Sequence, residues 1–94
     1  MADAMMPVLI NDVLAAAERL LPLPPRHRER ACRCLIDRAR RADAWRVAQG
    51  RVHPRFGNGT LEAAAMAGQT RRGARRGVDF LGCVATVLAC LSLD

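Results

Sequence analysis

The 94-residue chain contains no lysine and no tyrosine, and its large aromatic residues are limited to Trp45, Phe56 and Phe80. A core must therefore be built from aliphatic side chains and alanine. The alanine-rich runs favour helix, because alanine loses no side-chain entropy there, and few segments alternate with the two-residue period of a strand. The sequence thus predicts one compact all-α domain of about four helices over residues 1–94.

The sequence also lacks a membrane span and a signal peptide. Its most apolar segment, residues 78–93, is shorter than the roughly twenty residues that a spanning helix needs. The N-terminus has no basic region and its apolar run is broken, unlike a secretory leader. We therefore expect a cytoplasmic protein with no membrane partner, in which the cysteines are reduced.

No catalytic or metal-binding signature is present. The four cysteines are Cys32, Cys34, Cys83 and Cys90. None of them forms the C-x2-C pair that zinc sites use, so we expect them to pack as small apolar residues. Neither histidine has an acidic residue at a suggestive spacing. The prediction is a protein that is not an enzyme and has no cofactor, metal or small-molecule substrate.

All fifteen basic residues are arginine, and the net charge is +6 with a pI near 10.9. A GC-rich genome would account for the missing lysine, but the excess charge remains. It favours an anionic partner, which could be DNA, RNA or an acidic protein. The arginines predicted to contact this partner are Arg71, Arg72, Arg75 and Arg76 in the glycine-broken run 69–77, together with Arg26, Arg28, Arg30, Arg51 and Arg55.

The first predicted helix runs from about Asn11, as its N-cap, to Leu21, where a proline-rich segment ends it. Its apolar residues recur at helical spacing, which leaves Asp12 and Glu18 pointing towards solvent.

The second helix is predicted from Pro25 to Gln49, with Gly50 as its C-terminal glycine. The expected buried face consists of Ala31, Cys32, Cys34, Leu35, Ala39, Ala42 and Trp45. The opposite side carries an alternating ladder of charges that should pair within the helix: Glu29, Arg33, Asp37 and Arg41.

A glycine- and proline-rich loop follows. We expect Val52 and Phe56 to pack on the bundle near Trp45, and Thr60 to cap a short helix over Leu61–Ala67. His53 has no structural role that the sequence explains, so it is a candidate loop site for binding.

The last predicted helix, Phe80 to Leu93 with Asp79 as its N-cap, is apolar on every side. Such a helix has to be covered all round. Two arrangements fit, either the centre of the bundle or contact with a second chain, which would make a homo-oligomer. The second arrangement would use the small residues Gly82, Ala85, Thr86 and Ala89.

The segment Gly50–Ala64 has the pattern G-R-x-H-P-x-F-G-N-G-T-L-x-A-A and follows a proline-led, arginine- and alanine-rich helix. In both respects the chain resembles a family of short, uncharacterised bacterial proteins. The arginine run 69–77 is not part of this resemblance. It implies no known activity and no functional residue, and it implies an association with temperate phages or gene-transfer agents.

These observations predict a small, non-enzymatic accessory protein that binds nucleic acid or a nucleic-acid-handling partner. Without a helix-turn-helix pattern, the binding should be non-specific. The alternative is a protein–protein adaptor or an oligomeric DNA-packaging subunit, similar to a small terminase subunit in size and charge, that assembles through the last helix. A third hypothesis, an enzyme using His53, requires a pocket lined by an acid.

Overall fold

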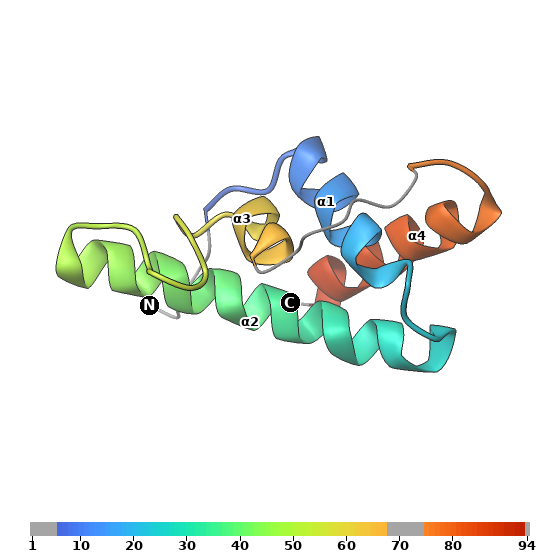
Figure 1. Ribbon diagram of the computed structural model, residues 1–94, viewed down its shortest axis with the longest axis horizontal. Coiled ribbons are helices and arrows are strands. Elements are labelled where there is room, and N and C mark those ends of the chain that lie inside the picture. Colours follow the sequence, from blue (N-terminus) through green and yellow to red (C-terminus); the bar gives the residue numbers. More distant parts are fainter. Residues whose placement is uncertain (1–5, 68–74, 94) are drawn as a thin grey trace.

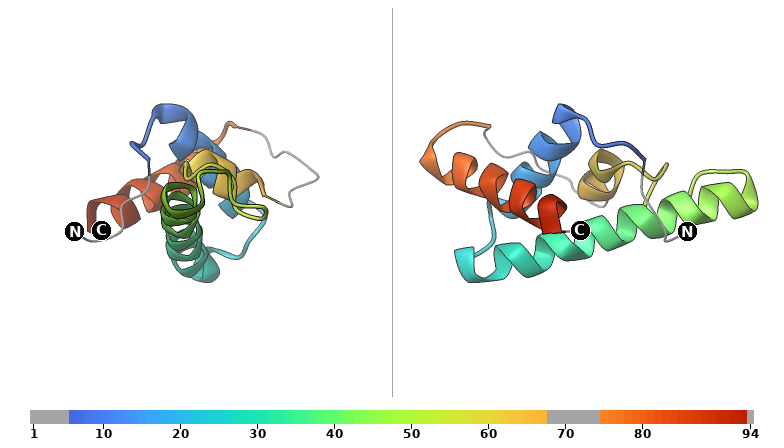
Figure 2. Two further views of the ribbon diagram at one scale, coloured as in Figure 1. Left: turned by 90° about the vertical axis from the view of Figure 1, so that its left-hand side faces the viewer. Right: turned by 180° about the vertical axis from the view of Figure 1, so that it is seen from behind.

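The computed structural model describes residues 6–67 and 75–93, which form four helices and no strand (Figure 1). The helices are α1 (Ile10–Leu20), α2 (Pro25–Gln49), α3 (Leu61–Met66) and α4 (Val78–Leu93). The predicted all-α bundle, with a loop between the second and third helices, is confirmed. The other three helices gather on one side of the long α2, and α1 lies between α3 and α4 (Figures 1 and 2).

The core is built from small side chains, as the scarcity of aromatic residues predicts. The largest fully buried side chains are Leu20, Cys32, Leu61, Cys83 and Val87. Alanines fill much of the remaining interior, and Ala15–Ala17 are at most 1% exposed. Such small residues let the helix axes approach closely, which explains how a short α1 can contact all three other helices.

The N-terminus of α1 differs from the prediction. Leu9 is the N-cap residue, and the cap hydrogen bond comes from its own N–H, which donates to Oδ2 of Asp12 at 2.7 Å. Oδ1 of the same carboxylate accepts the N–H of Glu62 in the first turn of α3 at 2.8 Å. The expectations that Asn11 caps this helix and that Asp12 faces solvent were therefore wrong. Buried at 4% exposure, this acid connects two helix N-termini.

Glu18 was also predicted to face solvent, and this was wrong as well. The side chain is 3% exposed and forms an ion pair with Nε of Arg75. The long arginine reaches the buried carboxylate from the segment before α4, 57 positions later in the chain. Helical periodicity places Glu18 on a polar face of α1 but does not show which segment covers that face.

The bounds of α2 and its end at Gly50 match the prediction, with Gly50 at a φ of 70°. The charge ladder on its outer side pairs as expected, Glu29 with Arg33 at 3.1 Å and Asp37 with Arg41 at 3.0 Å. Cys34, predicted to be buried, is exposed.

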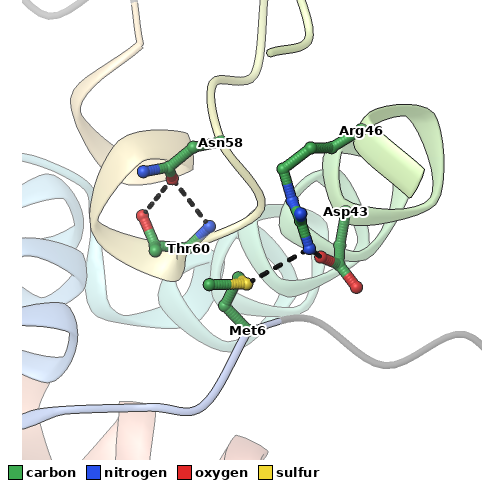
Figure 3. A network of polar contacts seen from close by, with 5 residues as sticks. All are labelled: Met6, Asp43, Arg46, Asn58 and Thr60. Carbon is green, nitrogen blue, oxygen red and sulfur yellow. Dashed lines mark hydrogen bonds and ion pairs between the residues drawn. The ribbon is translucent and has the colours of Figure 1, made fainter. Parts of the chain in front are cut away.

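The loop after α2 folds back onto that helix and is held by polar contacts (Figure 3). Asn58 Oδ1 accepts hydrogen bonds from the backbone N–H and the hydroxyl of Thr60. Thr60 Oγ1 in turn accepts the N–H of Ala63, which confirms it as the N-cap of α3. Arg46 donates to Asp43 at 2.8 Å and to the sulfur of Met6 at 3.5 Å, so the N-terminal segment is held at the same place.

Gly59 of this loop lies close against α2. Its φ is 97°, and a Cβ atom there would lie 2.9 Å from the Cα atom of Asp43. Only glycine satisfies both the positive φ and the lack of space. Val52, predicted to pack on the bundle, is instead 55% exposed.

α4 begins at Val78, so Asp79 lies in its first turn and is not the predicted N-cap. In the part of the chain that the structure describes, no helix has the length and apolar character needed to cross a bilayer.

Candidate functional surfaces

α4 has one buried side and one uncovered apolar side. Phe80, Cys83, Val87 and Cys90 face α1 and α2 and are buried. The interpretation of this segment as the centre of the bundle was therefore wrong. Among the described residues only these two helices contact α4, and it lies at one edge of the molecule (Figure 2).

The uncovered side carries large apolar side chains, and we call it the α4 outer face. Its exposed members are Val78 (87%), Leu81 (65%), Leu88 (51%) and Leu93 (75%), with Gly82, Ala85, Ala89 and Ser92 between them. No charged residue occurs from 80 to 93. The sequence did not indicate that Leu81 and Leu88 would be exposed, because a helix that is apolar all round gives no signal of which side is covered.

Two further features lie on or beside the α4 outer face. The hydroxyl of Thr86, a residue predicted for an interface, donates to the carbonyl of Gly82 at 3.1 Å, so a partner that covers this face would not leave the hydroxyl without a hydrogen bond. Beside it, an open groove of about 250 Å³ separates the C-terminal half of α4 from the start of α2. The groove is lined by Pro25, Glu29, Thr86, Ala89, Cys90 and Leu93.

The predicted anion-binding arginines fall into three groups: those with partners inside the molecule, those outside the described residues, and those that are exposed and have no described acidic partner. Arg28 is 9% exposed and donates to the carbonyls of Leu21 and Leu23 at 3.0 Å, so its guanidinium supports the α1–α2 connection. Arg75 is paired with Glu18, as described above. Arg71 and Arg72 lie outside the described residues.

The third group is exposed, and in the described part of the chain none of its members forms an ion pair with an acidic side chain. It consists of Arg26, Arg30, Arg51, Arg55 and Arg76. Arg26 donates to Nε2 of its neighbour His27 at 3.1 Å. The exposed arginines are therefore spread over the start of α2, the loop and the segment before α4.

His53, the candidate loop site, is half-buried in a tight turn. Its Nδ1 accepts the N–H groups of Arg55 and Phe56 at 3.0 and 3.1 Å. The imidazole stacks on the ring of Phe56 at 4.7 Å and meets Trp45 edge-on at 5.1 Å. Arg38 lies over the Phe56 ring at 5.5 Å from the centroid. His53 thus has a structural role that its sequence neighbours did not reveal: it closes the turn and joins the loop to α2.

The cysteines are all free, and only Cys34 is exposed. Burial and the neighbouring Cys90 thiol raise the pKa of Cys32 to about 12, and burial raises the pKa of Cys83. Within residues 6–67 and 75–93, no three or more His, Cys, Asp or Glu side chains are grouped so that they could hold a metal ion.

Comparison with known families shows the family of this chain. A family model described as "Domain of unknown function (DUF7742)" matches residues 6–91. The chain belongs to this family. No curated protein and no solved structure matches it.

The predicted membership of an uncharacterised family is thereby confirmed. The DUF7742 match extends from the N-terminal segment to the last turn of α4. The exposed arginines therefore lie within the matched residues, and so does the α4 outer face except for Ser92 and Leu93 at its end.

Proposed function

We propose that this DUF7742 protein is a non-enzymatic protein–protein interaction subunit whose docking surface is the α4 outer face. The observation that carries the proposal is the exposure of four large apolar side chains along one helix, with no charged residue after Asp79 in its first turn. Single exposed apolar residues are common on soluble proteins. A continuous apolar patch is characteristic of a surface that a partner covers.

The exposed apolar side chains of this face would supply part of the binding energy of a complex. Full burial of a valine or leucine side chain contributes about 1.5–3 kcal/mol. Weighted by their exposure, the four side chains would contribute on the order of 5 kcal/mol before the cost of association. Such a surface supports reversible binding, in keeping with an accessory or adaptor role.

Site-specific photo-crosslinking in cells tests this proposal. Benzoylphenylalanine replaces Leu88 on the α4 outer face or, as the matched control, Ala44 on the outer side of α2; both positions are exposed. The Leu88 variant should form a discrete protein adduct on irradiation and the Ala44 variant should not. If benzoylphenylalanine forms no adduct at Leu88 and none at Leu81, the α4 outer face is not a docking surface.

A second candidate function is binding of an anionic partner, most simply nucleic acid, through the exposed arginines. It is supported by the five exposed arginines that have no acidic partner among the described residues. Flexible guanidinium groups contact phosphates without selecting a base sequence. The pairing of Arg28 and Arg75 inside the molecule reduces this surface, which is why the candidate takes second place.

Salt-dependent DNA binding distinguishes paired from unpaired arginines. Arg26→Gln/Arg30→Gln removes two unpaired charges of α2, and Arg33→Gln/Arg41→Gln removes two charges that are already paired. If each unpaired arginine contacts a phosphate, the first variant should reduce the slope of log K against log salt by about 1.8, and the control should reduce it less. Equal effects, or no binding at low salt, would exclude this surface.

The proposal also includes a cytoplasmic setting with reduced cysteines. A link to phages, gene-transfer agents or DNA packaging would fit either an adaptor or a DNA-binding subunit.

A further inference from the structure

We infer that the partner of the α4 outer face is a second copy of this chain, packed with its α4 antiparallel about a two-fold axis beside Ala85. The inference rests on the proposed docking function of α4 and specifies the occupant and its orientation. Three independent features of the helix support it: the spacing of its exposed residues, an otherwise unexplained glycine, and the charges at its two ends.

The exposed residues form a seam with the three-four spacing of helices that pack along their length. Val78, Leu81, Ala85, Leu88 and Ser92 follow at intervals of 3, 4, 3 and 4 positions. The seam is centred on Ala85. A two-fold axis at that point makes the interface isologous, so each contact occurs twice. It brings Leu81 of one chain beside Leu88 of the other, on the same edge of the seam.

Gly82 on the other edge has no explanation within a single chain. Glycine inside a helix destabilises it relative to alanine, and a Cβ atom at this position would meet nothing within 4 Å. In the antiparallel pair, Gly82 lies opposite Ala89 of the second copy. Two small residues there let the helix backbones approach, while the leucines fill the other edge.

The charges at the ends of α4 favour the antiparallel orientation. Arg76 is exposed just before the first turn, and Asp79, the acid of that turn, lies 4.0 Å from Arg28. The last turn contains no basic residue to compensate the negative end of the helix dipole. In an antiparallel pair each Arg76 comes to the C-terminal end of the other α4. A parallel pair would bring the two arginines together and leave both C-terminal ends uncompensated.

The groove beside α4 extends the contact. Val78, the most exposed of the large apolar residues, would lie opposite the C-terminal half of the second α4, next to the groove lined by Ala89 and Leu93. Even so, a helix of about 24 Å provides less area than the roughly 800 Å² per partner of a standard interface. The dimer should therefore be concentration-dependent, with dissociation in the micromolar range or weaker.

Sedimentation equilibrium of the full chain, from roughly 1 µM to 1 mM, measures the association. The wild type should approach the dimer mass with rising concentration. Gly82→Leu should weaken dimerisation about tenfold or more, because added bulk in a packed interface is poorly accommodated, while the melting temperature at low concentration does not fall. The matched control Ala44→Leu adds the same bulk to the outer side of α2 and should dimerise like the wild type. A wild-type chain that stays monomeric throughout overturns the inference, as does an undiminished Gly82→Leu dimer.

Cysteine cross-linking in a Cys34→Ser background tests the orientation. Ala85→Cys should form a disulfide-linked dimer under mild oxidation, because the two thiols meet at the axis. Val78→Cys should not, because fourteen positions, or about 21 Å, separate the two thiols in the antiparallel pair. Cross-linking of both variants would indicate a parallel pair and overturn the inference, as would cross-linking of neither. A monomer whose Leu88 photo-adducts contain only other proteins would overturn this inference and leave the docking function standing.

Discussion

Replacing Asp12 by alanine removes the carboxylate that joins the start of α1 to the start of α3. One oxygen accepts the N–H of Leu9 at 2.7 Å and the other the N–H of Glu62 at 2.8 Å. Since the side chain is only 4% exposed, solvent can replace little of this bonding in the variant. The loss should therefore affect the packing of two helices and not only the fraying of one.

The expected magnitude follows from the two hydrogen bonds. A hydrogen bond to a charged group contributes about 1.5–3 kcal/mol, so Asp12→Ala should lower the free energy of unfolding by about 4 kcal/mol. Asp12→Asn keeps one acceptor oxygen and should lose about 2 kcal/mol. For a domain of this size that corresponds to a fall in melting temperature of about 8–16 °C for the asparagine variant. Against a total stability of about 5–15 kcal/mol, the alanine variant should lose between about a quarter and four fifths of the stability of the domain.

Urea and thermal unfolding followed by circular dichroism measure these changes. The control is Asn11→Ala at the neighbouring, exposed position, which sequence reasoning takes as the cap. It should cost no more than about 0.5 kcal/mol, as expected for an uninvolved surface position. A larger loss for Asn11→Ala than for Asp12→Ala, or a loss below about 1 kcal/mol for Asp12→Ala, would refute the assignment of the cap.

Three further predictions concern the interior and the loop. Arg75→Gln should cost about 3 kcal/mol, because it leaves a buried carboxylate unpaired, whereas Arg76→Gln should be nearly neutral; equal losses in urea unfolding would contradict the ion pair. Gly59→Ala should destabilise the protein more than Gly50→Ala, since both have positive φ but only Gly59 lacks space; the order of their melting temperatures decides. Stability should fall by up to about 1.4 kcal/mol per pH unit above pH 9, because the buried Cys32 thiol, whose pKa is raised to about 12, keeps its proton when the unfolded chain releases it. With no lysine or tyrosine to titrate there, a flat stability between pH 9 and 11 would contradict that shift.

The residue types of the candidate surfaces could be anticipated from the composition of the sequence. Which of these residues remain exposed and unpaired in the folded protein could not. The uniformly apolar α4 and the excess of arginine are visible in the sequence. Which side of α4 remains uncovered depends on α1 and α2, and which arginines remain unpaired depends on distant acids. Arg75 illustrates this: it lies in an arginine-rich run that suggests an exposed anion site, yet it meets a carboxylate 57 positions away.

By itself the sequence determined the helical class, the long α2, its end at Gly50 and the cap at Thr60. These depend on backbone preferences and on contacts within a few positions, which local residue types encode. Only the tertiary structure decided that Asp12 and Glu18 are buried, that His53 closes a turn against Trp45, and that one face of α4 is left open. Each of these requires a partner that local periodicity cannot specify, because it is brought close only when the helices pack.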